Sequence, residues 1–444
     1  MVKKIRQKAK QIVKPAFRWQ GLFFYLSLGM LFLLLAVLFT WPLMTNISSG
    51  IIGQSNFTDG PFFVWNIWWI KKALLSFQNP FYSNFVYYPA NTNLSLHTLT
   101  FTTGLIYLPF SLFFSEVVSL NLIQIASIII SALAMTYLVN YLSKAKNYLE
   151  KSTGIISGII FAFSPFVFSH LLAGHYNLTM LWPIPIVVLC LYKTIRENWF
   201  VNPIMLGVFL TLLGYLDLQL LLFTAIILAI ILITNSIFDP KTIFARRRLT
   251  HLAVSLLIFI TLFLVPYGLI VQGAWGIKTD FLTFNSADFK VLFGLNPLNP
   301  IFHYPFLTQV IKMIGSYREN VVPLGFTALF VSLVGCALFI RQFWKEKITF
   351  FLCLLVGFLF LVGPYFQKGS IVYYSLKLPY FYLEKLPLFD IGLVPPRFVV
   401  IVYFSLALLS GLSMISVMRF LVAKKLHFAA AVLVFISSIF CSLE

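Results

Sequence analysis

Apolar runs about as long as a membrane-crossing helix recur along the whole chain, and no other feature constrains the fold as strongly. A helix needs about 20 predominantly apolar residues to cross the roughly 30 Å hydrocarbon core of a bilayer. With 60% apolar and 10% charged residues, the chain is too apolar to fold around a soluble core. The sequence therefore predicts an all-α polytopic membrane protein with about eleven transmembrane helices. These runs lie at about 21–44, 117–142, 153–170, 177–192, 202–216, 218–236, 250–272, 320–341, 348–366, 397–418 and 426–441.

The basic residues lie mostly in short segments between the apolar runs, so the net charge of +19 reports membrane orientation rather than nucleic-acid binding. The run 98–114 decides that orientation, because Gly104 and Pro109 interrupt it. If 98–114 does not cross, 22 of the 32 Lys and Arg fall on one side. By the positive-inside rule this side is cytoplasmic and includes the basic N-terminus, 1–20. We expect 98–114 to be an interfacial or half-inserted helix.

Almost all the unusual polar residues then fall on the outer side, although only Lys and Arg were used to assign the sides. The outer side receives a long first loop, 45–116, with interfacial helices, and the segments 273–319 and 367–396. The inner loops are short and basic, and they contain no Gly-rich phosphate loop. This argues against a protein that is driven by nucleotide binding or hydrolysis in the cytoplasm. The sequence shows no internal repeat and no low-complexity linker, so we expect a single membrane domain, 1–444.

The two ends of the chain give two expectations. The run 21–44 follows seven basic residues, is longer than a signal h-region and lacks a small-residue cleavage site. We therefore expect it to be an uncleaved first span. The sequence stops at "CSLE", just beyond an apolar run, so we expect a native chain that continues past Glu444.

Asp59 lies in "FTDGP", directly after the first apolar run, and is one of only 13 acidic residues. Asp-Gly-Pro is a strong turn signal, and the aromatic segment that follows is typical of a helix lying in the membrane interface. One interpretation is that Asp59 only caps the helix that opens after Pro61. The other is a carboxylate at the membrane surface that takes a proton from an acceptor hydroxyl, or binds a divalent cation, Mg²⁺ or Mn²⁺, beside a phosphate.

Two connections between apolar runs carry further polar candidates. In "FSHLLAGHYNLTM" His175 follows Gly174, where an imidazole titrates near neutral pH or donates to a phosphate; the alternative is a polar turn residue at the bilayer edge. We expect His170, one turn deeper, to snorkel toward the surface. Asp217, in "LLGYLDLQLLLF", is costly in lipid and therefore predicts a polar cavity or a partner, unless it is a simple exposed turn.

Arginines at the outer edge run against the positive-inside trend. "IGSYREN" places Arg318 and Glu319 at the start of the eighth span, and "VPPRFVV" places Arg397 at the start of the tenth. The planar guanidinium group suits phosphate oxygens, and the alternative is interfacial snorkelling. With His97 in the first outer loop, the outer side offers carboxylate, imidazole and guanidinium groups. Such a set suits an anionic, lipid-linked substrate.

The order of these features resembles the GT-C superfamily of membrane glycosyltransferases. Its members have one N-terminal span, a long outer loop with an acid soon after it, an amphipathic segment, and then many spans with short inner loops. The resemblance covers most of the chain and implies a GT-C-like bundle in which Asp59 is the functional acid. Similar segments occur in uncharacterised bacterial and archaeal multipass proteins grouped with that superfamily: "TDGPFFVWNIWW", "NPFYSNFVYYPANTNLSLHT", "FAFSPFVFSHLLAGHYNL", "SADFKVLFGLNPLNP", "YRENVVPLGF" and "LPLFDIGLVPPRF".

Two features depart from the family pattern. Many relatives carry a second acid in a D-x-D or E-x-D pair, whereas this chain has Phe57 and Pro61 on either side of Asp59. This difference argues against tight metal binding by two carboxylates. In addition, no large soluble outer domain follows the last span, as it does in many peptide-glycosylating relatives.

The leading hypothesis is a GT-C-type hexosyl or pentosyl transferase of the cell membrane. It would move a sugar from a polyprenyl-phosphate-linked donor to a glycan, lipid or protein acceptor of the cell envelope on the outer face, among membrane lipids. Asp59 would be the base or would orient the acceptor or a cation, while Arg397 and Arg318 hold the donor phosphate. The expected substrate-binding set is completed by His175, Asp217, Glu319 and His97.

Two other interpretations come from different classes of protein. A transporter or flippase of a lipid-linked or anionic substrate would use Asp217 as a coupling site. Transporters are expected to show paired repeats and polar groups near the bilayer midplane, whereas here the polar groups crowd at one face. A pseudoenzyme or assembly scaffold is the third interpretation, and it predicts that Asp59 is dispensable.

Overall fold

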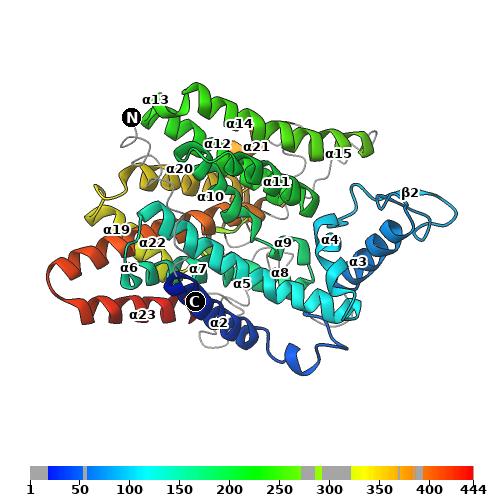
Figure 1. Ribbon diagram of the computed structural model, residues 1–444, viewed down its shortest axis with the longest axis horizontal. Coiled ribbons are helices and arrows are strands. Elements are labelled where there is room, and N and C mark those ends of the chain that lie inside the picture. The colour runs from blue at the N-terminus through cyan, green and yellow to red at the C-terminus, as the bar shows by residue number, and fades with distance from the viewer. Residues whose placement is uncertain are drawn as a thin grey trace, which may run out of the picture.

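Helices make up most of the part of the chain that the structure describes. The computed structural model describes residues 19–53, 58–271, 286–292, 322–368, 371–383, 386 and 394–443. Figure 1 shows the long helices lying side by side as a bundle. The elements of the first half are α2 (Trp19–Phe39), η1 (Leu43–Thr45), α3 (Gly60–Leu75), β1 (Tyr82–Ser83), β2 (Thr92–Asn93), α4 (Phe101–Phe110), α5 (Glu116–Ser143), α6 (Tyr148–Ser152), α7 (Gly154–Ala162), α8 (Pro165–Ala173), α9 (Tyr176–Thr179), α10 (Pro183–Arg196) and α11 (Val201–Leu216). The elements of the second half are α12 (Leu218–Phe238), α13 (Pro240–Ile243), α14 (Arg246–Phe259), η2 (Ile260–Leu264), α15 (Val265–Ile270), α17 (Phe289–Leu292), α19 (Phe326–Leu338), α20 (Trp344–Leu361), β3 (Tyr365–Lys368), β4 (Ile371–Lys377), α21 (Pro379–Leu383), η4 (Pro395–Phe398), α22 (Val399–Ala423) and α23 (His427–Leu443).

Six helices among the described residues are long and apolar enough to cross a membrane, so the architecture is that of an all-α membrane protein. Three further predicted spans correspond to the shorter apolar helices α11, α19 and α23. The predicted span 177–192 is divided between α9 and α10. The predicted span 348–366 lies largely in α20, which carries charged residues in its first turn. The total of eleven spans stays a prediction. The six long helical segments are Gly21–Phe39, Glu116–Ser143, Tyr148–Ala173, Leu218–Phe238, Arg246–Ile270 and Pro395–Ala423.

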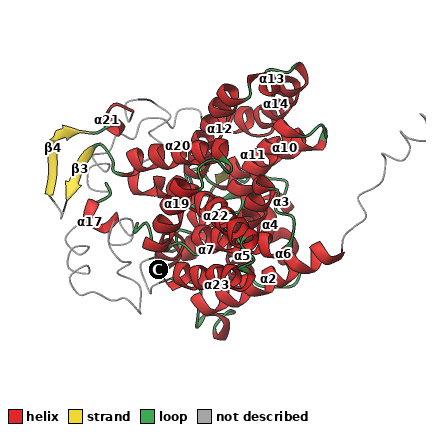
Figure 2. Cartoon of the chain, turned by 90° about the vertical axis from the view of Figure 1, so that its left-hand side faces the viewer, coloured by secondary structure: helices red, strands yellow, loops and turns green. Residues whose placement is uncertain are grey.

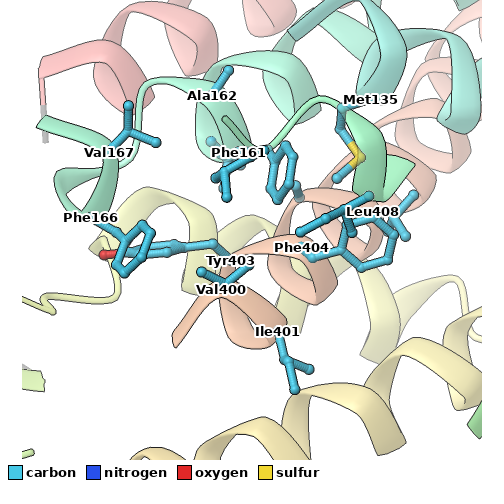
Figure 3. Packing of buried hydrophobic residues seen from close by; sticks show 14 of the residues in the cluster. Met135, Phe161, Ala162, Phe166, Val167, Val400, Ile401, Tyr403, Phe404 and Leu408 are labelled. Carbon is cyan, nitrogen blue, oxygen red and sulfur yellow. The ribbon is translucent and has the colours of Figure 1, made fainter. Parts of the chain in front are cut away.

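The helix α22 runs through the centre of the bundle, and its residues are buried from Val399 to Ser416. It packs against α5, α7, α12, α19, α20 and α23. A helix that is apolar all round is expected in such a position. In Figure 3, Phe404 of α22 lies against Phe161 of α7, and their ring centroids are 5.7 Å apart. Because Arg397 directly precedes α22 within η4, this central helix anchors one of the candidate site residues.

Small residues let the helices approach α22 closely. A Cβ atom on Gly411 would overlap the hydroxyl of Ser157 in α7, and one on Gly335 of α19 would overlap Ser413. Lipid tails are as apolar as leucine side chains, so close packing rather than the hydrophobic effect holds helices together in a membrane. These contacts therefore fix the position of α22 within the bundle.

Basic segments of the described part of the chain gather at one end of the bundle. A guanidinium nitrogen of Arg196 lies 2.7 Å from a carboxylate oxygen of Glu346. The corresponding pair between Arg419 and Glu150 is 3.0 Å apart. The loops that follow α5, α10 and α22 and the start of α20 therefore share one end, which we call the basic end (left in Figure 1).

Four of the polar residues that the sequence predicts at the outer surface lie at the opposite end: Asp59, His175, Asp217 and Arg397. Asp217 directly precedes α12, whereas Phe238, the last residue of α12, accepts a hydrogen bond from Lys345 at the basic end. A helix of 21 residues is about 31 Å long, roughly the thickness of the hydrocarbon core. The separation predicted from Lys and Arg alone is thus present in the fold. Which end faces the cytoplasm stays a prediction.

The first predicted outer loop is largely structured. It contains α3 and α4, which pack against each other and against α5, and the two-residue strands β1 and β2. The ten residues of α4 span about 15 Å, half of what a crossing requires. The antiparallel β3 and β4 project from one side of the bundle in Figure 2. Of the other predicted outer segments, 367–396 includes β4 and α21, and 273–319 lies largely outside the described residues.

Candidate functional site

A pocket of about 180 Å³ opens at the end of the bundle opposite the basic end. Three of the predicted site residues, Asp59, His175 and Arg397, line this pocket. They come from the start of α3, the connection between α8 and α9, and η4, which are far apart in the sequence. The other lining residues are Phe62, Phe63, Thr98, Asn177 and Leu178.

Asp59 occupies the N-cap position of α3, but its carboxylate makes no capping hydrogen bond to the helix. Its backbone N–H donates to the carbonyl of Ala173 at 3.4 Å. The side chain of Asp59 is 64% exposed, and its Oδ2 lies 3.4 Å from Nε2 of His175. The helix begins without that cap because Pro61, at its second position, has a φ already suited to a helix. The carboxylate of Asp59 is therefore directed to the pocket rather than to the helix.

The turn after α8 brings His175 to this carboxylate. Gly174 adopts φ 76°, and the N–H of His175 donates to the carbonyl of His170 at 2.9 Å. This is the Schellman arrangement, which requires a left-handed residue at the end of a helix and so favours glycine. A Cβ atom on residue 174 would lie 2.5 Å from the backbone nitrogen of Gly60. Gly174 is therefore needed both to close the turn and to let it touch the start of α3.

His170 and His175 lie side by side as a result of this turn. The Nδ1 atoms of the two rings are 2.9 Å apart, which is a hydrogen-bond distance. His170 is only 1% exposed, so it does not snorkel to the surface as the sequence predicted. The ring of Phe166 covers it, with 4.3 Å between the ring centroids. Asp59, His175 and His170 thus form a continuous row from the pocket into the protein.

Asp217 lies behind the pocket and is connected to it through Asn177. Its carboxylate accepts hydrogen bonds from the Leu220 N–H at 2.8 Å and from the Asn177 side-chain amide at 2.6 Å. Burial raises the pKa of Asp217 above its ordinary value, and these hydrogen bonds act in the opposite direction. Asp217 therefore caps α12, which differs from the simple exposed turn of the alternative interpretation, and it also orients a residue that lines the pocket.

Arg397 reaches the pocket from η4 and is oriented by α12. Its Nη1 donates to the side-chain oxygen of Gln219 at 2.8 Å. The helix α3 begins at the pocket, and a helix N-terminus carries partial positive charge. Together with the guanidinium group, it makes this end of the pocket favourable for an anion.

His97 does not line the pocket but supports its wall. Its ring packs on Phe62 with 4.0 Å between centroids, and its Nε2 lies 3.2 Å from the side-chain oxygen of Asn66. Burial lowers the pKa of His97 to about 4, so the ring is neutral at physiological pH. The amide of the buried Asn66 also donates to the carbonyl of Thr98, a pocket residue, at 2.7 Å.

The other predictions for the site have different outcomes. Arg318 and Glu319 lie outside the described residues. Within the described ranges, no group of three or more His, Cys, Asp and Glu side chains could hold a metal ion. Among the described residues, the titratable group beside Asp59 is His175 rather than a second carboxylate, and Mg²⁺ prefers oxygen ligands. The described side chains therefore do not fit a divalent cation, and no step of the chemistry is assigned to one.

Sequence reasoning missed three pocket residues that had a usable signal. Phe62 and Phe63 follow Asp59 by three and four positions, the spacing that places side chains on one face of a helix. Asn177 follows His175 by two residues in the same connection. The pairing of Asp59 with His175 had no local signal, because periodicity predicts the faces of helices and not which helix ends meet.

Compared with known proteins, the chain matches no family model, and no curated protein is significantly similar to it. What the protein does therefore has to be inferred from the chemistry of the pocket itself.

Proposed function

We propose that this protein is a GT-C-type membrane glycosyltransferase, which transfers a sugar from a polyprenyl-phosphate-linked donor to an acceptor hydroxyl at the pocket. The observation that carries the proposal is the meeting of a carboxylate, an imidazole and a guanidinium group on one pocket at the end of membrane-length helices. The resemblance of the sequence to GT-C proteins, with Asp59 at the position of their functional acid, supports the same function.

In the proposed reaction Asp59 is the general base. The acceptor oxygen attacks the anomeric carbon of the sugar, and its proton passes to the Asp59 carboxylate. The bond between that carbon and the phosphate oxygen breaks, and its electron pair leaves with the polyprenyl phosphate. The 64% exposure of the Asp59 side chain fits a base that meets its acceptor from the water side.

Arg397 is the proposed partner of the donor phosphate. The leaving phosphate gains negative charge as the bond breaks, so a fixed cation stabilises the transition state more than the bound donor. A planar guanidinium group can donate two parallel hydrogen bonds to phosphate oxygens. The contact with Gln219 at 2.8 Å holds Arg397 in place before the donor arrives.

The experiment that tests the function is transfer of labelled sugar in proteoliposomes from a panel of synthetic polyprenyl-phosphate donors to host envelope fractions. Asp59→Asn is expected to lower transfer about 10²- to 10⁴-fold, the usual contribution of a general base, with donor binding retained. Asp239→Asn is the matched control, because Asp239 caps α13 at the basic end and asparagine is an equally good cap.

Three other outcomes would contradict the proposal. Full transfer by Asp59→Asn would remove Asp59 from the chemical step. The absence of transfer by the wild type across the panel, together with movement of a lipid-linked substrate between leaflets, would identify a transporter. The absence of both activities, with the envelope phenotype of the host unchanged by Asp59→Asn, would identify a scaffold.

A further inference from the structure

We propose that His170 is a positioning residue, which fixes the protonated form of His175 through the contact between their Nδ1 atoms. This inference deepens the proposed function and rests on it, because the role of His175 is to prepare Asp59 as the base. His170 lines no part of the pocket and is 1% exposed. The contact that links it to the pocket is the one with His175.

The geometry of the row restricts where its protons lie. Two Nδ1 atoms 2.9 Å apart share one proton, because two lone pairs or two N–H groups would repel at that distance. On its other side, Nε2 of His175 faces a carboxylate oxygen of Asp59 at 3.4 Å, and an ionised carboxylate only accepts hydrogen bonds. We assign the protons accordingly: His170 donates its Nδ1–H to His175, and the Nε2–H of His175 is directed to the carboxylate of Asp59.

This assignment has a chemical consequence for Asp59. The N–H of His175 is directed to Oδ2 at 3.4 Å, so we assign Oδ1 as the oxygen that receives the proton of the acceptor. If His175 were an imidazolium, its positive charge would stabilise the ionised carboxylate and make Asp59 a weaker base. By occupying the Nδ1 lone pair of His175, His170 opposes that protonation and keeps Asp59 reactive.

Two contacts hold His170 beside His175. The Schellman turn fixes the backbone of His175 against His170 at 2.9 Å, and the ring of Phe166 packs on the ring of His170. Among the described residues, the elements around the pocket carry other titratable or charged groups near His175. These groups are Asp59 at the start of α3, Arg397 in η4, Asp217 behind Asn177, Tyr176 in α9, and His97 behind Phe62.

The test uses two substitutions of His170 in the full chain. An asparagine side chain can donate a hydrogen bond from nearly the same position as Nδ1. We therefore expect His170→Asn to keep kcat within a few-fold of the wild type and to keep the wild-type pH profile of kcat. A phenylalanine side chain cannot donate, so His170→Phe is expected to lower kcat at least tenfold with an unchanged KM for the donor. The acid limb of its kcat profile should move to higher pH, because the Nδ1 lone pair of His175 no longer accepts a hydrogen bond from residue 170 and binds a proton more readily.

A second measurement separates this inference from the proposed function. Solid-state ¹⁵N NMR of histidine-labelled protein in liposomes, assigned with His175→Gln, should show a correlation between the two Nδ1 atoms and a proton on Nε2 of His175. A kcat profile of His170→Phe identical to the wild type, or the absence of that correlation, would overturn the role of His170. If the wild type transfers no sugar, the proposed function fails, while the spectrum still decides whether His170 sets the form of His175.

Discussion

Asp59 illustrates an N-cap position that is used for something other than capping. Its carboxylate lies 3.4 Å from the His175 ring and makes no hydrogen bond to the first turn of α3. A capping side chain usually stabilises a helix by about 1 kcal/mol, so α3 forgoes this stabilisation. Burial of other α3 side chains, including Phe63, Ile67 and Ile70, holds the helix in place instead. A polar residue that gives up a favourable local bond in this way is a reasonable candidate for a functional role.

The state of His97 predicts how stability depends on pH. Burial lowers its pKa to about 4 in the folded protein, whereas the unfolded chain binds the proton near pH 6.5. The contribution of His97 to stability is therefore complete above pH 6.5 and is lost as the pH falls toward 4. This loss is at most a few kcal/mol, at about 1.4 kcal/mol per pKa unit.

Thermal unfolding in detergent at pH 7.5 and pH 4.5 measures this effect. The wild type should lose more stability on acidification than His97→Gln. The matched control His427→Gln, at an exposed position, should behave as the wild type. Equal losses in the wild type and in His97→Gln would contradict the assignment of a neutral, buried His97.

At the scale of elements, the turn between α8 and α9 determines whether the site forms. Gly174→Ala places a side chain at φ 76° and brings its Cβ to 2.5 Å from the backbone of Gly60. We expect it to lower the free energy of unfolding by about 1–3 kcal/mol and to reduce transfer, because the contact between the turn and α3 opens. Gly268→Ala in α15 is the control, since a Cβ there meets nothing within 4 Å. A Gly174→Ala variant as stable and active as Gly268→Ala would contradict this role of the turn.

Some elements could be predicted from the sequence because local chemistry determines them. The helix after Asp59 follows from a Gly-Pro start and helical spacing, and the six long helices follow from the length of their apolar runs. The run 177–192 shows what apolar content cannot predict. Pro183 and Pro185 have no backbone N–H to donate, and α10 begins at Pro183 after a break behind α9. An apolar run is therefore compatible with either a continuous or an interrupted helix.

The candidate site was predictable in its residue types and only partly in its contacts. Charge and cost in lipid singled out Asp59, His175 and Arg397, which do line one pocket. The same reasoning placed His170 at the surface, although the protein buries it against Phe166. A histidine one turn from a membrane edge can face either way, and the choice depends on a neighbouring helix that one segment of sequence does not reveal.

At the scale of the whole molecule, the fold separates two chemically different ends. The ion pairs of Arg196 and Arg419 lie at the basic end, and the pocket lies at the other, with α12 and α22 running between them. This arrangement supports the proposal that the protein binds an anionic substrate at one membrane surface, with the basic end at the cytoplasmic surface as the positive-inside rule predicts.

The separation of the two ends predicts which residues face the outside of the cell. Single cysteines at Ser49, near the pocket end, and at Lys241, at the basic end, would be placed in a chain whose four free cysteines are replaced. A membrane-impermeant maleimide should label Ser49→Cys in intact cells and Lys241→Cys only after permeabilisation. The reverse pattern would place the pocket in the cytoplasm and contradict an outer active site.

The central claim, that this pocket binds the phosphate of a polyprenyl carrier, is tested most directly by photoaffinity labelling. A photoreactive polyprenyl-phosphate probe should crosslink to peptides that contain Phe62 or Leu178, and unlabelled polyprenyl phosphate should compete. Arg397→Gln should weaken the labelling about 10- to 100-fold, the range expected for hydrogen bonds to a charged group, whereas Arg246→Gln at an exposed position of the basic end should not. Crosslinks confined to the basic end, or labelling unaffected by Arg397→Gln, would contradict the account.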